Sequence, residues 1–354
     1  MNTLTLKPLV SIIINNYNYD RFLSEAINSA LSQSYEQIEV IVVDDGSTDN
    51  SRHIIAEYGD RIIPILQPNG KQAAAFNSGF ARSQGEIIIF LDSDDYLFPQ
   101  AVAEIVKVWR PDLAKVHYRL DVVNSVGESL GYSSPQGTLP LSQGKVWQML
   151  LETSGYVSTP TSGNALNRQA LTDLFPIPDE YKLTADDYLS FQVPFYGEVM
   201  AVDHALGAYR VHDSNQWALS TVTGDRFKRF VHHDLQNFAL ITNKAQELGY
   251  QIPPDLEQRS IGRLWSRIIS LRLNAQNHPV ESDRSSQLIY QGIRSLWKYS
   301  NFNLPKRIFY SLWFIWVGLM PLSLAKPAIS WLYAPHHRPK LIGWTTTKLK
   351  ELMS

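Results

Sequence analysis

Apolar runs and helical repeats of apolar residues alternate through the first ninety residues of the chain. The runs predict buried strands, and apolar residues spaced three or four positions apart predict helices between them. The expected strands lie at 10–15, 39–43, 62–66 and 86–91, and the expected helices at 21–33, 47–58 and 73–83. This alternation predicts a parallel sheet with right-handed crossovers and helices on both faces. We therefore expect an α/β fold.

The pattern changes in the second half of the chain. A helix is expected at 99–110 and strands at 114–123, whereas 127–144 is rich in Gly, Ser and Pro and is expected to form loops. After Asp225 helical spacing dominates, as in FKRFVHHDLQNFALI and IGRLWSRIISLRL. These changes predict a boundary near residues 218–226. It would separate a catalytic domain at 1–220 from a mainly helical region at 221–354.

The composition and charge of the chain exclude several kinds of site. The chain has 354 residues, of which 44% are apolar, and no cysteine, which excludes disulfides, thiolate metal sites and a cysteine nucleophile. No export signal is evident, so a cytoplasmic protein is expected. Residues 1–220 carry 14 basic and 26 acidic side chains, whereas residues 221–354 carry 18 and 8. The two parts are therefore expected to have different partners.

One apolar segment stands out in the basic part. Residues 308–325 are 18 consecutive uncharged residues between Arg307 and Lys326. Seven of the nine tryptophans lie at or after Trp217, a composition suited to a headgroup layer with anionic lipid. We expect peripheral membrane attachment through residues 306–334. A spanning helix, a buried core helix and a homodimer contact remain alternatives. Gly318 and Pro321 interrupt the segment, which weakens the case for a spanning helix.

Acidic residues directly follow two of the expected strands. Asp44 and Asp45 follow EVIVV, and Asp92 and Asp94 follow EIIIFL. Open α/β sheets bind ligands at the carboxyl ends of their strands, so this pattern predicts a site for a metal-bound, phosphate-bearing substrate. Asp45 is our candidate to accept a hydrogen bond from a base imide. The alternative for residues 44–51 is an ordinary βα loop with helix-capping residues.

The acidic sequence DSDD at 92–95 favours a divalent metal. Its carboxylates are hard oxygen ligands that suit Mg²⁺ or Mn²⁺. An EF-hand loop is excluded, because the sixth position is Leu97 rather than Gly and the twelfth is Ala103 rather than Glu. The turn NNYNYD has no GxGxxG motif, and Gly70-Lys71 lacks the rest of a P-loop. Side chains and a metal are therefore expected to hold the phosphates.

Two further motifs have a structural and a functional interpretation. Asp186 and Asp187 lie at the start of an expected helix, where negative charge is favoured by the helix dipole, and one of them is also suited to act as a general base. His212 follows a strand-like stretch in YRVHDSN. It is either a structural histidine or a metal ligand.

In order and spacing these pieces resemble the inverting family 2 glycosyltransferases of GT-A fold. The resemblance covers residues 8–217 and rests first on VSIIINNYNYDRFLSEAINSALSQSYEQIEVIVVDDGSTDNS and NGKQAAAFNSGFARSQGEIIIFLDSDD. Later, TSGNALNRQAL resembles the family's donor loop, TADD its acidic motif and YRVH its carboxyl-terminal histidine. The resemblance implies a Rossmann-like mixed sheet flanked by helices, followed here by a helical extension.

The resemblance also implies roles for individual residues. Asp187 would be the catalytic base, and Asp94 and His212 would bind Mn²⁺ or Mg²⁺. The residues implied to bind the nucleotide sugar are Tyr17 and Asp45 at the uracil, Asp44 in the same loop, Lys71 near the phosphates, Asp92 at the ribose, and Gly163, Asn164 and Asp186 at the sugar. Where relatives often carry Arg, this chain has Phe76, which removes one phosphate contact.

The implied reaction is a single displacement with inversion, from a UDP-sugar to a hydroxyl of a glycan or lipid-linked acceptor in cell-surface polysaccharide synthesis. No QxxRW sequence follows Asp187, so non-processive transfer is expected. We expect no nucleic-acid partner and a location at the inner face of the cell membrane. Two other classes remain open: an inactive sugar-nucleotide-binding scaffold, and a nucleotidyltransferase of the same fold.

Overall fold

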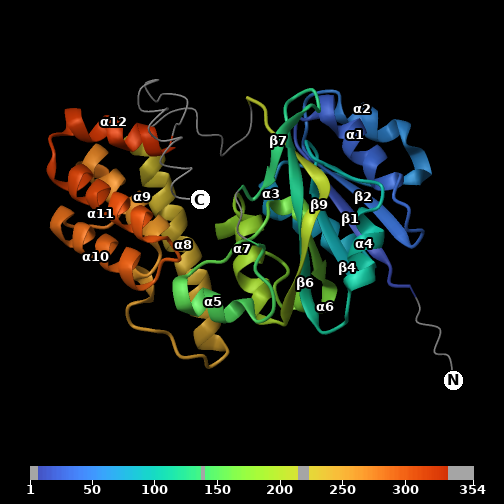
Figure 1. The fold of residues 1–354 in the computed structure, drawn as a ribbon. Helices are drawn as coiled ribbons and strands as arrows, with labels where there is room; N and C mark the ends of the chain where they lie inside the picture. The colour runs from blue at the N-terminus through green and yellow to red at the C-terminus, as the bar shows by residue number, and fades with distance from the viewer. Residues whose placement is uncertain (1–6, 137–139, 214–222, 334–354) are drawn as a thin grey trace. The chain divides into compact units, whose positions relative to one another are not determined.

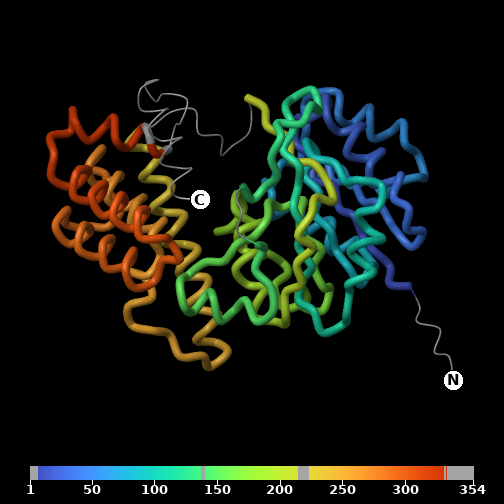
Figure 2. The backbone as a smooth tube through the Cα atoms, in the orientation of Figure 1, coloured from blue at the N-terminus to red at the C-terminus, as the bar shows by residue number. Residues whose placement is uncertain are grey.

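The computed structural model describes residues 7–136, 140–213 and 223–333. The chain divides into two compact units, which are Met1–Gln148 with Tyr156–Asn215, and Met149–Gly155 with Gln216–Ser354. Figure 2 traces the chain through both units. Of the expected domain boundary at 218–226, residues 218–222 lie outside the described residues.

The first unit is built on one mixed sheet (Figure 1). Its parallel part, in the order β3-β2-β1-β4, consists of β3 (Ile63–Gln67), β2 (Ile38–Asp45), β1 (Val10–Asn16) and β4 (Ile87–Asp92). β8 (Asn164–Asn167) then pairs antiparallel with both β4 and β6 (Leu113–Val123), and β9 (Glu198–Arg210) runs parallel to β6. The short β5 (Tyr96–Leu97) pairs antiparallel with β9.

Helices cover both faces of this sheet, because the apolar strands alternate their side chains between two cores. Ile12 and Ile14 pack in one core with Leu23 of α1. Ile13 packs in the other with Phe76 of α3. The helices of this unit are α1 (Asp20–Leu31), α2 (Ser51–Glu57), α3 (Lys71–Arg82), α4 (Ala101–Val108), α6 (Arg168–Thr172) and α7 (Ala185–Gln192), and α5 (Val146–Thr153) spans the division between the units.

The second unit is helical, with α8 (Gly224–Glu247), α9 (Ile261–Leu273), α10 (Ser285–Lys298), α11 (Leu304–Leu319) and α12 (Leu322–Tyr333). Phe227, Leu264 and Phe314 belong to its core. The apolar run at 308–325 is divided between α11 and α12. The division falls before Pro321, where Met320 is extended because a residue that precedes proline disfavours the helical region. Within the described residues, we find no helix with the length and apolar character needed to cross a bilayer.

The predicted fold class is confirmed: an α/β unit with a mixed sheet flanked by helices, followed by a helical region. One local prediction was wrong. The segment 127–144, expected as loops, contains β7 (Ser129–Ser134), which pairs antiparallel with β6. Its sequence, SLGYSS, is polar and mostly exposed, so no apolar pattern marked it as a strand. It forms because it supplies backbone partners to the edge of β6.

Candidate active site

Acidic side chains from two strands meet at the carboxyl end of β1. Asn15 and Asn16, the last residues of β1, pair in register with Asp92 of β4 and Asp44 of β2. The side-chain amide of Asn15 donates to Asp92 at 2.9 Å, and that of Asn16 donates to Asp44 at 3.1 Å. The two asparagines therefore hold neighbouring carboxylates in place at the edge where α/β folds bind ligands.

Asp44 and Asp45 are both buried and hydrogen-bonded within the protein. Asp44 accepts from the backbone of Ser47 at 3.1 Å and from Arg52 Nε at 2.9 Å, so it stabilises its own turn. Asp45 Oδ1 accepts from Gln67 and from the Gly70 amide, and Oδ2 accepts from the Lys71 amide at 2.7 Å. A carboxylate oxygen can accept two hydrogen bonds, so Oδ2 retains capacity for one more donor.

Tyr17 and Lys71 lie beside Asp45 and complete a first group of predicted residues. The Tyr17 ring is 45% exposed, and Lys71 Nζ lies 5.7 Å from its centroid. Lys71 begins α3 with φ of 71°, which directs its amide to Asp45. An exposed aromatic ring, a cation and a carboxylate are thus gathered at one place. Such a set is suited to stack on a base and to contact its polar edge.

Asp92, Asp94 and His212 form a second group. His212 Nε2 lies 3.0 Å from Asp94 Oδ2, and Arg21 donates to His212 Nδ1 at 3.1 Å. Burial, followed by the charge of Asp94, raises the pKa of Asp92 to about 6. Asp95, which we had not selected, accepts from Ser162 Oγ at 2.6 Å and from the Arg210 amide at 2.9 Å. Both bonds are made within the protein, so we interpret Asp95 as a structural residue.

The second group has the chemistry of a metal site but not a complete set of ligands. Among residues 7–136, 140–213 and 223–333, no three Asp, Glu or His side chains are arranged to hold a metal ion. Asp94 and His212 offer an oxygen and a nitrogen, which suit Mg²⁺ or Mn²⁺. Burial, and after it the charge of Asp94, raises the pKa of Asp92, and a nearby cation would oppose both effects by favouring the ionised carboxylate. These residues therefore fit a metal whose other ligands are substrate oxygens.

A cavity of about 180 Å³ contains the third group of predicted residues. Asp186 and Asp187, from the first turn of α7, line it together with Asn164 from β8. Its remaining walls come from α3, β4, β6, the segment before β8, and other residues of β8 and α7. In that order these residues are Phe76, Phe90, Lys115, Thr159, Pro160, Thr161, Leu166, Leu189 and Ser190. One side is thus apolar and the other carries carboxylates, an amide and an amine.

The segment before β8 connects this cavity to the acidic group. The side chain of Thr161 lines the cavity and forms a hydrogen bond that lowers the pKa of Asp92, against the raising effect of burial. Ser162 Oγ accepts from the Asp92 amide at 3.1 Å. Gly163 has no space for a side chain, since a Cβ there would lie 2.8 Å from the Thr159 side chain and from the Tyr118 carbonyl oxygen.

Tyr209 is another residue near these groups that we had not selected. Burial comes first among the causes that raise the pKa of its phenol. The charges of four carboxylates follow, those of Asp95, Asp92, Asp94 and Asp186. The acidic group and Asp186 therefore both affect the pKa of this hydroxyl. The sequence had marked Asp186 but gave no reason to select Tyr209.

Lys115 is a second residue that we had not selected. It is 1% exposed, and its Nζ lies 2.9 Å from Tyr156 Oη, 2.9 Å from Asn164 Oδ1 and 3.4 Å from Ser158 Oγ. Tyr156 Oη in turn donates to the Ser190 carbonyl oxygen of α7 at 2.8 Å. Lys115 therefore joins β6 to β8 and to the helix that carries Asp187.

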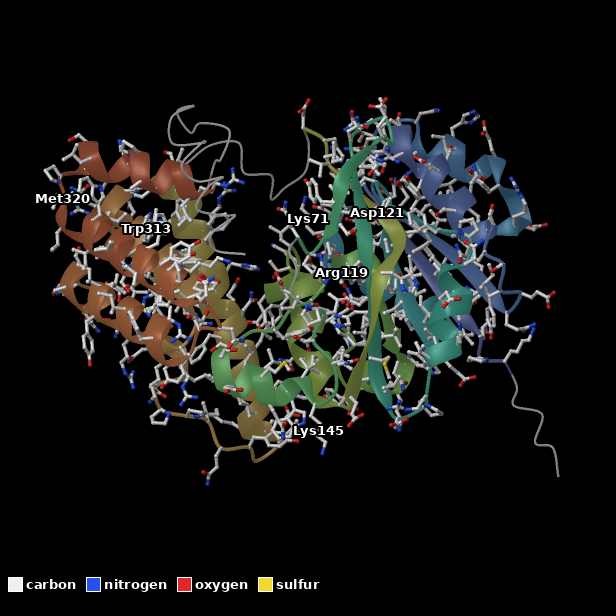
Figure 3. All side chains as sticks on the ribbon, viewed as in Figure 1. Lys71, Arg119, Asp121, Lys145, Trp313 and Met320 are labelled. Carbon is white, nitrogen blue, oxygen red and sulfur yellow. The ribbon has the colours of Figure 1, made fainter. Side chains whose placement is uncertain are left out.

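A signal for Lys115 was present in the alternation of β6. Polar residues occur at every second position of this strand, as Lys115, His117, Arg119 and Asp121, and the latter two are labelled in Figure 3. The alternate side chains between them are buried in the core. Burial, followed by the charge of Lys115, lowers the pKa of His117 to about 3, so His117 is neutral. One face of β6 is thus polar although it is largely covered.

Comparisons with known proteins show which family the first half of the chain resembles. Residues 11–162 match the family model described as glycosyl transferase family 2. An uncharacterized glycosyltransferase from Nostoc sp. is 39% identical over 212 residues, which are 58% of this chain and 66% of that protein. The chain thus spans slightly less than two thirds of this relative.

Two solved structures show similar folds at low sequence identity. S. aureus TarS 1-349 in complex with UDP-GlcNAc is 14% identical, with a TM-score of 0.49 over 92% of this chain and 91% of that one. The mannosyltransferase PcManGT from Pyrobaculum calidifontis, in complex with GDP-Man and Mn²⁺, is 16% identical, with a TM-score of 0.48 over 93% and 86%.

Proposed function

We propose, from the membership of residues 11–162 in glycosyl transferase family 2, that this chain moves a sugar from a nucleotide-diphosphate donor to an acceptor hydroxyl with inversion. The observation that carries this proposal is the segment before β8: Thr161 lines the cavity together with Asp186 and Asp187, and the adjacent Ser162 accepts a hydrogen bond from the Asp92 amide at 3.1 Å. A donor needs a base site, a diphosphate site and a sugar site in succession. The three residue groups supply them in that order.

The first group would bind the nucleotide. The exposed ring of Tyr17 would stack on the base, and Asp45 Oδ2 would accept a hydrogen bond from the imide N–H of uracil. A UDP-sugar is therefore the proposed donor. Asp44 would maintain the turn, as its bonds to Ser47 and Arg52 do in the structure. Lys71 Nζ, above the Tyr17 ring, is available to contact a phosphate.

The second group would hold the ribose and the diphosphate. Asp92, fixed by Asn15, would accept a hydrogen bond from a ribose hydroxyl. Asp94 and His212 would hold Mn²⁺ or Mg²⁺. When bound, such an ion would stabilise the negative charge that develops on the departing diphosphate. In the absence of a metal, His212 orients the Asp94 carboxylate through the contact between Nε2 and Oδ2.

The cavity would receive the sugar and the attacking hydroxyl. Asn164, with its amide orientation fixed by Lys115, would bind sugar hydroxyls beside Gly163. Asp187 would accept the proton of the acceptor hydroxyl while that oxygen attacks the anomeric carbon from the side opposite the diphosphate. The carbon–oxygen bond to the diphosphate breaks as the new one forms. Asp186 would support the site from the same helical turn.

The proposed acceptor and location follow from the composition of the second part of the chain. We propose a glycan or lipid-linked acceptor at the inner face of a membrane, because residues 221–354 combine excess positive charge with most of the tryptophans. Non-processive transfer is proposed because no QxxRW sequence follows Asp187. The mechanism above does not depend on the identity of the acceptor.

The proposal is tested by sugar-nucleotide turnover. A panel of nucleotide sugars is incubated with the full chain, with Mn²⁺, Mg²⁺ or EDTA, and release of nucleoside diphosphate is measured. We expect metal-dependent turnover of at least one UDP-sugar. Asp187→Asn should lower it by on the order of 10²–10⁴-fold, because proton transfer is lost while the shape is kept.

The matched control is Asp173→Asn, which changes an exposed aspartate elsewhere in the same unit and should leave turnover unchanged. Donor binding without turnover in the wild type would favour the inactive scaffold instead. Release of pyrophosphate from UTP in the presence of a sugar phosphate would favour the nucleotidyltransferase.

A further inference from the structure

The outward face of α11 carries a continuous row of exposed apolar side chains. This row, the α11 stripe, consists of Leu304, Ile308, Leu312, Ile315 and Leu319. Their exposed fractions range from 37% to 61%. The spacing of three or four residues places them on one side of the helix, along about 22 Å of its length. A row of this kind is rare on a surface that faces only water.

The opposite face of the same helix is part of the protein core. Trp313, Phe314 and Val317 are buried, and Trp313 Nε1 donates to the Ala328 carbonyl oxygen of α12 at 3.1 Å. Figure 3 labels Trp313 within the helical unit and Met320 at the end of α11. The helix is therefore fixed in its unit. It is apolar on both sides, and within the described part of the chain the side that carries the stripe is the more exposed one.

Tryptophans border the stripe. Trp316 is 44% exposed and donates from Nε1 to the Leu324 carbonyl oxygen at 3.0 Å, and Leu324 is itself exposed. Trp297 of α10 is also exposed and donates to Ser311 Oγ of α11 at 3.2 Å. Tryptophan favours the boundary between an apolar layer and water, where its ring and its N–H are both accommodated.

Within α10, α11 and α12 all charged residues are basic, and one of them, Arg294, is paired with Asp255 of the same unit. No Asp or Glu occurs between residues 284 and 350. The basic residues of α10, α11 and α12 are Arg294, Lys298, Lys306, Arg307 and Lys326. A protein interface of ordinary composition has a polar rim with both charges. A cationic rim around an apolar face is complementary to anionic headgroups above acyl chains.

We infer that the α11 stripe docks onto the surface of an anionic bilayer, with its leucines and isoleucines at the acyl boundary and the cations among the headgroups. Each buried apolar side chain adds to binding, and each lysine or arginine near the surface adds electrostatic attraction to the anionic headgroups. The inference uses only the second unit. It does not require that the transferase reaction proposed above be correct.

The test is co-sedimentation of the full chain with lipid vesicles. Vesicles of phosphatidylcholine alone are compared with vesicles that also contain phosphatidylglycerol, at low and at high salt. We expect binding to the anionic vesicles that weakens as salt increases. Leu312→Gln combined with Ile315→Gln should weaken binding at least about ten-fold, because two exposed apolar groups no longer enter the bilayer. Lys306→Gln combined with Lys326→Gln should reduce the salt dependence.

The matched control is Leu248→Gln, which replaces an exposed leucine at the end of α8, outside the stripe. It should leave vesicle binding unchanged, and circular dichroism should show that all variants are folded. Equal binding by the Leu312→Gln, Ile315→Gln variant would overturn the inference. So would a dimer in light scattering that this variant dissociates, since a second copy would then cover the stripe. Vesicle binding that requires removal of residues 334–354 would assign the stripe to that segment instead.

Discussion

Arg21 of α1 donates a hydrogen bond to Nδ1 of His212, with 3.1 Å between the two nitrogens. A guanidinium group has no acceptor, so Nδ1 is the acceptor in this bond. In the neutral imidazole the ring proton then lies on Nε2, which donates to Asp94 at 3.0 Å. Coordination of a metal by Nε2 would require the proton to move to Nδ1 and the bond from Arg21 to break. In this geometry Arg21 thus opposes ligation of a metal by His212.

We expect Arg21→Met to change the tautomer of His212 and to lower the Mn²⁺ concentration needed for half-maximal turnover about ten-fold, because Nε2 is then available to the proposed metal and residues that orient a ligand have effects of this size. The tautomer is measured from the ¹⁵N chemical shifts of the ring in metal-free protein. The wild type should show the Nε2–H form, and the variant a mixture. Arg82→Met, at an exposed arginine of α3, is the control. Identical ¹⁵N shifts in wild type and Arg21→Met would show that Arg21 does not select the tautomer.

Lys115 should be necessary for turnover although it lies away from the nucleotide. It fixes the Asn164 amide and, through Tyr156, the backbone of α7 at Ser190. We expect Lys115→Met to lower turnover about 100-fold, because small displacements of reacting groups have effects of this size. Binding of UDP, measured by calorimetry, should remain within about two-fold of wild type, because the residues proposed to contact UDP belong to the other two groups.

The control for this variant is Lys107→Met, at an exposed lysine of α4, which should leave both quantities unchanged. A Lys115→Met protein that loses UDP binding and turnover together would indicate a general loss of structure. A protein that keeps both would show that Lys115 does not position the site.

The apolar runs made the centre of the sheet predictable. The strands β1, β2 and β4 are buried on both faces, so each is continuously apolar and ends at polar residues that mark the binding edge. The change from parallel to antiparallel pairing, which occurs at β8, was not marked by an apolar run in the sequence. Its four residues, NALN, acquire strand structure only by bonding to β4 and β6, which are distant in sequence. Pairing between distant segments cannot be deduced from local periodicity.

The same distinction applies to the site. Carboxylates at strand ends, such as Asp92 and Asp94, could be selected because their position in the sequence fixes their position on the sheet. Tyr209 could not, because it becomes relevant only through neighbours that are close in space. The alternation of β6 marked Lys115 as a polar position, but it did not show that this residue is buried against Asn164. Lys115 also lies inside a strand, where a polar residue at an alternate position ordinarily faces water. Here the segment at 156–164 covers it.

Gly163→Ala should destabilise the protein. A Cβ at this position would lie 2.8 Å from Thr159 and from the carbonyl oxygen of Tyr118, and the latter belongs to the backbone of the central sheet. Overpacking at such a site costs about 1–3 kcal/mol, which should appear as a lower urea midpoint of the first unit. Gly262→Ala, in α9, is the control because no atom lies within 4 Å of its added Cβ. Equal midpoints for wild type and Gly163→Ala would show that the segment adjusts without cost.

The helical unit should lose stability at acidic pH through Asp283. This aspartate is buried, and it accepts hydrogen bonds from Arg267 and, at 2.9 Å, from His278. Burial alone would raise its pKa, but the bonds from His278 and Arg267 lower the pKa below its ordinary value of 3.8. A carboxyl group with a lower pKa in the folded state stabilises the fold above pH 4. That stabilisation is lost as the pH falls through the folded-state value.

We therefore expect the urea midpoint of wild type to fall below about pH 4 more steeply than that of Asp283→Asn. At pH 7 the variant should be less stable by about 3–5 kcal/mol, because Arg267 remains buried with one of its two carboxylate partners removed. Tryptophan fluorescence is a suitable probe, since seven of the nine tryptophans lie at or after residue 217. Glu281→Gln, at an exposed position, should follow the wild-type curve. Parallel pH curves for wild type and Asp283→Asn would mean that Asp283 is not the acid-sensitive group.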